Sequence, residues 1–196
     1  MIKDMPFFPH PPEAIPPSCW LLEEGTLTGI APGRTDLFSD PLEDKRIDSA
    51  PTFLFPAHGD FLLQARITVD FAATFDAGVL LLFQDYDHWA KLCFEYSPQQ
   101  NPMIVSVVNR SISDDCNSAL IEGSSVYLRA ARRGRGFAFH YSNDSSYWHL
   151  VRAFVLLDLP VQAGFLVQSP TGVGCRVRFS EIGYRPETLG DIRSGE

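Results

Sequence analysis

Apolar and polar residues alternate along much of this chain, most clearly from Phe75 to Tyr96, in the segment FDAGVLLLFQDYDHWAKLCFEY. The segment contains two strand-like runs joined by a short polar turn. In the second run the odd-numbered residues from Trp89 to Glu95 project to one side and their even-numbered neighbours to the other, because successive strand residues face opposite ways. The even set is apolar and is expected to face a core, whereas the odd set is expected to form a wetter face.

The same alternation predicts strands along most of the chain. Besides the two runs above, the expected strands span residues 18–22, 26–30, 61–71, 103–109, 125–133, 137–141, 148–156, 162–168 and 175–184. Segments rich in Gly, Asn and Asp at 132–136 and 142–146 predict hairpin turns, because these residues tolerate positive φ. Many short strands without intervening helices predict an all-β fold, an antiparallel two-sheet β-sandwich or barrel.

Breaks in this pattern divide the chain into three parts. Residues 1–17 contain six prolines and are expected to form an extended N-terminal arm. Residues 18–184 form the predicted sandwich domain, and residues 185–196 form a polar C-terminal tail that is expected to fray. Within the domain, residues 31–51 are polar and contain Asp and Pro breakers. A loop of this length is often functional, so it is expected to border a site.

Composition narrows the choice of partners and compartment. The 196-residue chain suits one large β-sandwich, and its net charge of −8 argues against a nucleic-acid partner, which requires a basic surface. The basic cluster is expected on the solvent side of a strand and turn: Arg129, Arg132, Arg133 and Arg135. The sequence shows neither a signal-peptide core nor a run of about 20 apolar residues, so no membrane association is predicted. Four scattered cysteines without a CxxC pair predict free thiols and a cytoplasmic location.

Nine short segments, in a fixed order, carry a family resemblance. They are TD at Thr35–Asp36, GDF at Gly59–Phe61, FDAGVLL at Phe75–Leu81, DHWAKLCFEY at Asp87–Tyr96, VSVVNRSISD at Val105–Asp114, VYLRAARRG at Val126–Gly134, FHYSNDSSYWHLVR at Phe139–Arg152, SP at Ser169–Pro170 and VRFSEI at Val177–Ile182. Over roughly residues 18–184 the chain resembles the family of unknown function typified by the regulation-of-enolase protein. The resemblance implies a jelly-roll double sheet of the concanavalin A-like lectin/glucanase type. It implies little chemistry, because fold alone does not assign function.

The polar face of the 89–95 run is the leading candidate site. Lys91 and Glu95 lie about 13 Å apart at ~3.3 Å per residue, so they do not pair directly. Their partners are expected on neighbouring strands, among polar residues in strand runs: Gln84, Asn109, Arg129, Arg152 and Gln168. The hypothesis is that a ligand ring stacks on Trp89, that Lys91 and an arginine donate charge-assisted hydrogen bonds, and that hydroxyl groups donate to Glu95. The expected ligand is carbohydrate-like or a small anion.

Other interpretations of this face stay open. Its charged residues could form cross-strand ion pairs on a solvated sheet. Glycoside hydrolysis usually requires two carboxyl groups, about 5–5.5 Å or 6.5–9.5 Å apart, whereas the strand run offers only Glu95. A second acid would have to come from expected turns, at Asp85, Asp87 or Asp114. A hydrolase with an atypical acid pair is therefore an alternative, and a non-catalytic binding or regulatory role is the leading hypothesis.

The sequence predicts no metal and no cofactor. The acidic turn at residues 85–88 lacks the glycine-flanked pattern of a calcium loop, and Cys93 has no adjacent histidine to act as a base. A further hypothesis follows from the family name, namely a protein-interaction regulator of central metabolism that acts through the proline-rich arm or the 31–51 loop. Dimerisation also stays open, because sandwiches have edge strands that can pair.

Overall fold

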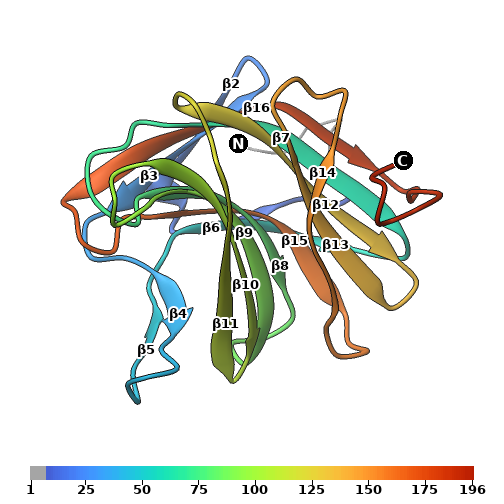
Figure 1. Cartoon of the computed structure of the whole chain (residues 1–196), viewed down its shortest axis with the longest axis horizontal. Helices are drawn as coiled ribbons and strands as arrows, with labels where there is room; N and C mark the ends of the chain where they lie inside the picture. Colours follow the sequence, from blue (N-terminus) through green and yellow to red (C-terminus); the bar gives the residue numbers. More distant parts are fainter. Residues whose placement is uncertain (1–7) are drawn as a thin grey trace.

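A computed structural model describes residues 8–196 and shows two antiparallel sheets packed face to face (Figure 1). The first sheet has the strand order β1 (Glu13–Ile15), β6 (Thr52–Ala57), β15 (Val161–Gln168), β8 (Ala77–Phe83), β9 (His88–Tyr96), β10 (Pro102–Arg110) and β11 (Ile112–Leu120). The second has the order β14 (His149–Val155), β13 (Gly136–Ser142), β12 (Ser125–Arg133), β7 (Phe61–Val69), β16 (Gly174–Arg185), β3 (Thr26–Pro32) and β2 (Trp20–Glu23). The predicted jelly-roll type of β-sandwich is confirmed.

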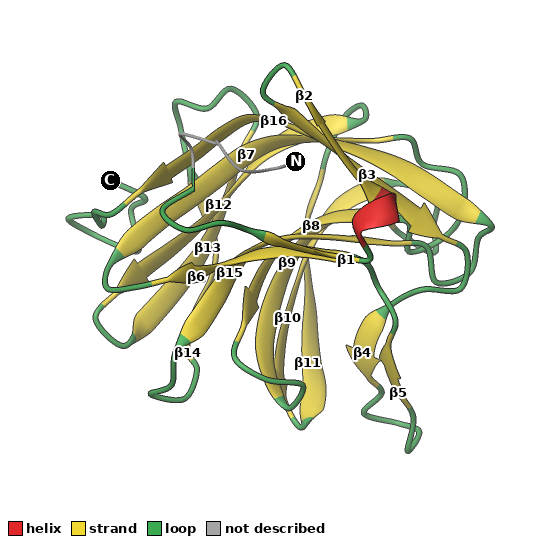
Figure 2. Ribbon diagram, turned by 180° about the vertical axis from the view of Figure 1, so that it is seen from behind, coloured by secondary structure: helices red, strands yellow, loops and turns green. Residues whose placement is uncertain are grey.

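Two smaller elements complete the described chain. A single 3-10 turn, η1 (Pro17–Cys19), precedes β2, and a hairpin is formed by β4 (Leu37–Ser39) and β5 (Arg46–Asp48). Figure 2 shows the hairpin extending away from the two layers, outside the sandwich itself. The Ser39 backbone N–H donates a hydrogen bond of 2.9 Å to Ser113 Oγ, which fixes the hairpin against β11. Residues 8–196 include no helix with the length and hydrophobicity needed to span a bilayer.

The alternation in β9 places its side chains on the predicted sides, but the odd-numbered face is buried rather than wet. Ala90, Leu92 and Phe94 are fully buried between the two sheets. Trp89 and Cys93 belong instead to a second cluster of buried residues, on the outer face of the first sheet. The two predicted turns also form: β12 and β13 flank residues 134–135, and β13 and β14 flank residues 143–148.

Five strands lie outside the predicted set: β1, β4, β5, β6 and β11. β11 is an edge strand with the sequence ISDDCNSAL, and because most of it is exposed it shows no apolar alternation. The expectation that Asp114 lies in a turn is therefore wrong. β6 contains Pro56, which argues against a strand because it cannot donate a ladder hydrogen bond.

Both ends of the domain pack more closely than the sequence suggests. In the proline-rich segment, β1 pairs with β6, and the Phe8 and Phe55 ring centroids lie 4.7 Å apart. Residues 1–7 of the expected arm lie outside the described residues. The C-terminal tail is held in place rather than frayed, because Leu189 is buried and the Gly195 carbonyl accepts a 2.8 Å hydrogen bond from Arg129.

Candidate binding site

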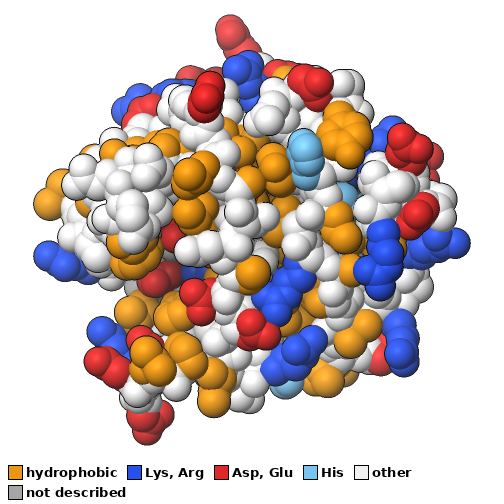
Figure 3. Space-filling model, viewed as in Figure 1, with side chains coloured by type: hydrophobic (Ala, Val, Ile, Leu, Met, Phe, Trp, Pro, Cys, Tyr) orange, Lys and Arg blue, Asp and Glu red, His pale blue; other side chains and the backbone are white. Residues whose placement is uncertain are grey.

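A cavity of about 390 Å³ opens on the outer face of the first sheet, beside the β4–β5 hairpin. In the space-filling view a hollow lies between the hairpin, at the lower left, and the body of the sandwich (Figure 3). The charged residues that line the cavity are Asp36, Asp40, Lys45, Lys91, Glu95 and Asp115. The loop at residues 31–51, which was expected to border a site, contributes half of these charges and forms one wall.

The strand register brings distant residues to the floor of the cavity. In one row of facing positions, Lys91 of β9 lies two strands from Asp115 of β11. Four residues further along β9, on the same face, Glu95 lies two strands from Gln168 of β15. Because facing residues in a sheet project to the same side, all four side chains lie on the outer face.

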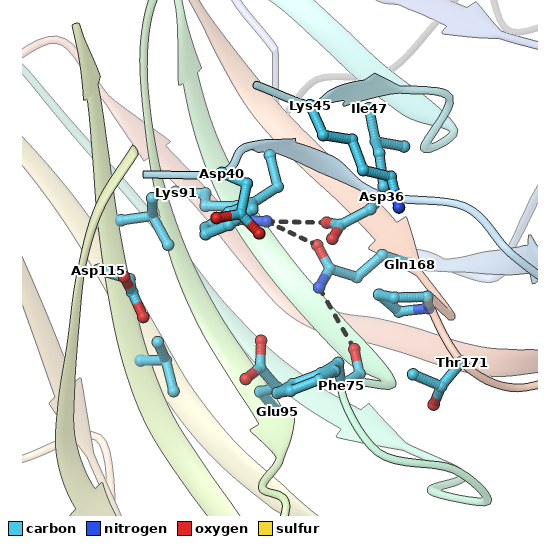
Figure 4. Close-up of a pocket in the computed structure, with 14 residues that line it drawn as sticks. Asp36, Asp40, Lys45, Ile47, Phe75, Lys91, Glu95, Asp115, Gln168 and Thr171 are labelled. Atoms are coloured by element: carbon cyan, nitrogen blue, oxygen red, sulfur yellow. Dashed lines mark hydrogen bonds and ion pairs between the residues drawn. The ribbon is translucent and has the colours of Figure 1, made fainter. Parts of the chain in front are cut away.

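Lys91 uses every hydrogen-bond donor that it has. Its Nζ donates to Asp36 Oδ1 at 3.1 Å and to Gln168 Oε1 at 2.9 Å (Figure 4), and to the Leu37 carbonyl at 2.7 Å. An ammonium group has three N–H donors, so none remains for a ligand. The side chain of Lys91 is only 2% exposed. Lys91 therefore ties the 31–51 loop to the sheet and orients Asp36 and Gln168.

The charge on Lys91 is maintained by its surroundings. Burial alone would lower the pKa of Lys91, but the attraction of Asp36, with smaller contributions from Cys93 and Glu95, outweighs burial and raises the pKa. Asp36 accepts a second hydrogen bond at Oδ1 from the Leu37 backbone N–H at 2.7 Å. The Lys91–Asp36 pair is thus a buried ion pair in which Lys91 Nζ and Asp36 Oδ1 are both fully hydrogen-bonded.

Glu95 differs from Lys91 because it has no such partners. It is 9% exposed, and no residue of the described chain donates a hydrogen bond to its carboxyl group. Figure 4 shows this group pointing into the cavity. Burial raises the pKa of Glu95 to about 8; Lys91 opposes the increase, whereas Asp36 and Asp115 add to it. At neutral pH the side chain is therefore mainly a neutral acid that can both donate and accept.

Trp89 and Asn109 lie on the same face but outside the cavity. The Trp89 ring is 1% exposed and packs with Phe38 and Leu37, so the stacking role expected for Trp89 does not fit its position. Asn109 is fully buried; its Nδ2 donates to the Asp87 carbonyl at 2.9 Å, and its Oδ1 accepts from Ser113 Oγ at 3.1 Å. Trp89 packs against the β4–β5 hairpin directly, and Asn109 binds Ser113, which in turn accepts a hydrogen bond from the hairpin.

Arg129 and Arg152 lie in the second sheet, so the structure does not bring them to the cavity. The prediction that Arg129 faces solvent is wrong: it is 6% exposed, and its guanidinium lies 3.6 Å from the centroid of the Trp148 ring. Burial lowers the pKa of Arg129 to about 10. Arg152 forms a 2.9 Å ion pair with Asp114, which joins β14 to β11. Gln84 binds the carbonyls of residues 157 and 159.

Replacing Arg152 with alanine is expected to have small effects. Its partner Asp114 has a side chain that is 64% exposed, and exposed ion pairs contribute about 0.2–1 kcal/mol. We expect a loss of up to about 1 kcal/mol of stability in urea denaturation and no change in ligand affinity. A larger loss of affinity would show that the second sheet takes part in binding.

Several residues of the cavity were missed by sequence reasoning. Asp36 and Phe38 lie in the loop that was expected to border a site; Asp36 belongs to the TD segment of the family resemblance, but neither residue was expected to take part in a site. Asp115 lies in a polar edge strand that the sequence does not reveal. Phe75 lines the cavity with a ring that is 36% exposed, and its φ of 70° is unusual for a residue other than glycine.

The acids considered as partners of Glu95 serve other purposes. Asp85 accepts hydrogen bonds from the backbone of its own turn, and Asp87 pairs with Arg46 at 3.0 Å. Cys93 is fully buried, and burial raises its pKa well above the ordinary range, so it is an inert thiol. In the part of the chain that the structure describes, no three His, Cys, Asp or Glu residues are grouped to hold a metal ion.

The sandwich is similar to several solved structures. A protein of unknown function from Saccharomyces cerevisiae has a TM-score of 0.81 and 24% identity, over 89% of this chain and 94% of that one. The xylan β-1,4-xylosidase from Bacillus halodurans C-125 has a TM-score of 0.70 and 14% identity, over 86% of this chain and 34% of the enzyme. The carbohydrate-binding module CBM66 from Bacillus subtilis has a TM-score of 0.51 and 14% identity, over 85% of this chain and 90% of the module. These similarities show the fold.

Sequence comparison adds one family. No curated protein matches the chain. The family described as protein of unknown function (DUF1349) matches residues 14–187. The match spans nearly all of both sheets, the hairpin and every residue that lines the cavity.

Proposed function

The chain belongs to the DUF1349 family of proteins of unknown function, and we propose that it is a non-catalytic ligand-binding β-sandwich. Its ligand would be a small polyhydroxylated, carbohydrate-like molecule, with a small anion as the alternative. The site would be the cavity lined by Glu95, Gln168 and Asp115, with Lys91 as the residue that positions its wall.

The single observation that carries this proposal is the state of Glu95. A buried carboxyl group without a hydrogen-bond partner is destabilising, because burial disfavours polar groups that are not paired. Glu95 has no partner within residues 8–196, although its carboxyl group faces an open cavity. A ligand hydroxyl group in the cavity would supply the missing hydrogen bonds.

The rest of the cavity supports a polyhydroxylated ligand. Gln168 donates only a long 3.3 Å hydrogen bond to the Phe75 carbonyl, so its amide retains an N–H for a ligand. The exposed ring of Phe75 offers an apolar face against which a sugar ring can pack, the role that was expected of Trp89. The volume of about 390 Å³ lies in the lower part of the range for small-molecule sites, about 300–1,000 Å³.

The relatives support the choice of ligand class. The module from Bacillus subtilis is named for carbohydrate binding, and the enzyme from Bacillus halodurans is named for its action on xylan. The chain spans only about a third of that enzyme, so the enzyme's activity is not transferred with the fold. These names make pentoses and hexoses the first sugars to test.

Binding of methyl β-D-xyloside and methyl β-D-glucoside, measured by calorimetry, tests the proposal. We expect Glu95→Ala to weaken binding by about 10–100-fold, because each lost hydrogen bond to a buried group is worth about 1–3 kcal/mol. Glu95→Gln should retain most of the affinity, since an amide keeps one acceptor and a donor. Arg152→Ala is the control. The proposal would be contradicted if no member of a wider panel of sugars and anions bound, or if Glu95→Ala left the affinity unchanged.

A carbohydrate-active hydrolase is the second candidate, and one observation favours it. Glu95 is mainly protonated at neutral pH, as a general acid must be, and Asp115 lines the same cavity. This candidate predicts release of the aryl group from an aryl β-xyloside, lost in both Glu95→Gln and Asp115→Asn. Binding without turnover separates the first candidate from this one.

The third candidate is a protein-interaction regulator of central metabolism that uses the β4–β5 hairpin. Leu42, at the tip of the hairpin, is 93% exposed. Capture of a metabolic enzyme that is lost in Leu42→Ser but kept in Glu95→Ala would favour it.

We also propose a cytoplasmic location, which is supported by four free cysteines.

A further inference from the structure

We propose that the cavity selects ligands that donate many hydrogen bonds and carry no negative charge, so that it accepts neutral sugars and rejects uronic acids and sugar phosphates. This inference rests on the proposed function of the same cavity. It narrows the ligand class from carbohydrate-like or anionic to polyhydroxylated and non-anionic.

Among the described residues, the floor of the cavity offers an anion no buried cationic donor. Lys91 is the buried cation of the cavity, yet its three N–H groups are committed to Asp36, Leu37 and Gln168. The remaining cation in the lining is Lys45, which lies on the exposed hairpin. An anion bound on the floor would therefore meet no buried donor with a positive charge, unlike anions in sites built from arginine or lysine.

The lining of the cavity is rich in oxygen atoms that can accept hydrogen bonds from a ligand. Glu95 receives no hydrogen bond from the described residues, and Asp115, an exposed residue of the edge strand β11, also lines the cavity with its carboxylate. Asp36, which also lines the cavity, uses Oδ1 for Lys91 and Leu37, and its Oδ2 accepts no hydrogen bond from the described residues. Open oxygen atoms need donors, and the hydroxyl groups of a sugar supply them.

The charges of the lining also disfavour an anionic ligand. Lys91 and Asp36 neutralise each other at 3.1 Å. The remaining charged residues of the lining are one cation, Lys45, and two anions, Asp40 and Asp115. The lining therefore has an excess of negative charge even when Glu95 is neutral. A unit charge about 8 Å away at an effective dielectric constant of about 20 contributes about 2 kcal/mol, which corresponds to more than tenfold in affinity.

Three methyl β-D-glycosides provide the test, because they share one ring configuration and differ only in the group on the last ring carbon. The xyloside carries a hydrogen atom there, the glucoside a hydroxymethyl group and the glucuronide a carboxylate. We expect the glucuronide to bind at least about tenfold more weakly than the glucoside at pH 7 and low salt. Asp115→Asn should reduce this difference at least about threefold by improving glucuronide binding. Asp114→Asn, next in sequence but on the other face, is the matched control and should leave it unchanged.

Two results would overturn the inference in distinguishable ways. Equal or tighter binding of the glucuronide than of the glucoside would refute charge selection while leaving the proposed function in place. Absence of binding for all three glycosides and for the wider sugar panel would remove the proposed function and the inference with it.

Discussion

Glu95→Gln is expected to stabilise the folded protein by about 3 kcal/mol at pH 7. Burial raises the pKa of Glu95 from 4.5 to about 8, so folding at pH 7 requires an ionised carboxylate to take up a proton. Each pH unit between the pKa of the unfolded chain and the working pH costs about 1.4 kcal/mol. Glutamine has a similar shape and no charge in either state, so this cost disappears.

The difference in stability between the native sequence and Glu95→Gln is expected to increase with pH. Below about pH 4.5 Glu95 is protonated in both the folded and the unfolded chain, and the two proteins should be equally stable. Between about pH 4.5 and 8 only the folded chain holds the proton, so the stability of the native sequence falls relative to Glu95→Gln as pH rises. The groups that set this pKa are Lys91, Asp36 and Asp115, and all three are present in both proteins.

Urea denaturation from pH 4 to pH 8.5 measures both effects. Glu23→Gln is the matched control, because Glu23 is exposed on the edge strand β2, and it should change stability by less than about 0.5 kcal/mol. Parallel stability curves for the native sequence and Glu95→Gln would mean that Glu95 is ionised in the folded state. Such a result would also remove the argument that the protein tolerates a destabilising residue for the sake of its site.

The residues of β9 show what the sequence can and cannot establish. Alternation correctly placed Lys91 and Glu95 on the face opposite Ala90, Leu92 and Phe94. It did not show that a loop covers this face. The covering loop contacts Lys91 through Asp36, which is 55 residues away in the sequence, and a local pattern carries no information about such a distant segment. The expected wet face is therefore a cavity floor.

The arginines show a second limit. Alternation indicates on which side of a strand a residue lies, but not to which sheet the strand belongs. Arg129 and Arg152 are polar residues in strands, as predicted, yet β12 and β14 belong to the second sheet. Asp115 shows the converse, since an exposed edge strand needs no apolar residues and leaves no pattern to detect. Strand pairing across the chain decides both cases.

Lys91→Met is expected to destabilise the protein by about 3–4 kcal/mol. Methionine fills a similar volume but leaves Asp36 as a buried charge without its partner, and breaking a buried pair from one side costs about 3–5 kcal/mol. Asp36 has a side chain that is 15% exposed, so water compensates only in part. The carbonyl of Leu37 and Oε1 of Gln168 lose their donor as well.

A double-mutant cycle with Asp36→Asn separates the ion pair from these other losses. Because the neutral amide removes the stranded charge, Lys91→Met should cost at least about 1 kcal/mol less in the Asp36→Asn background than in the native one. Arg178→Met is the control for an exposed pair: its partner is Asp70, the side chains are 40% and 51% exposed, and the expected loss is at most about 1 kcal/mol. If Lys91→Met were no more harmful than Arg178→Met, the 31–51 loop would not be anchored by Lys91. The cavity wall that the loop forms would then lack the fixed geometry that selective binding of a small ligand requires.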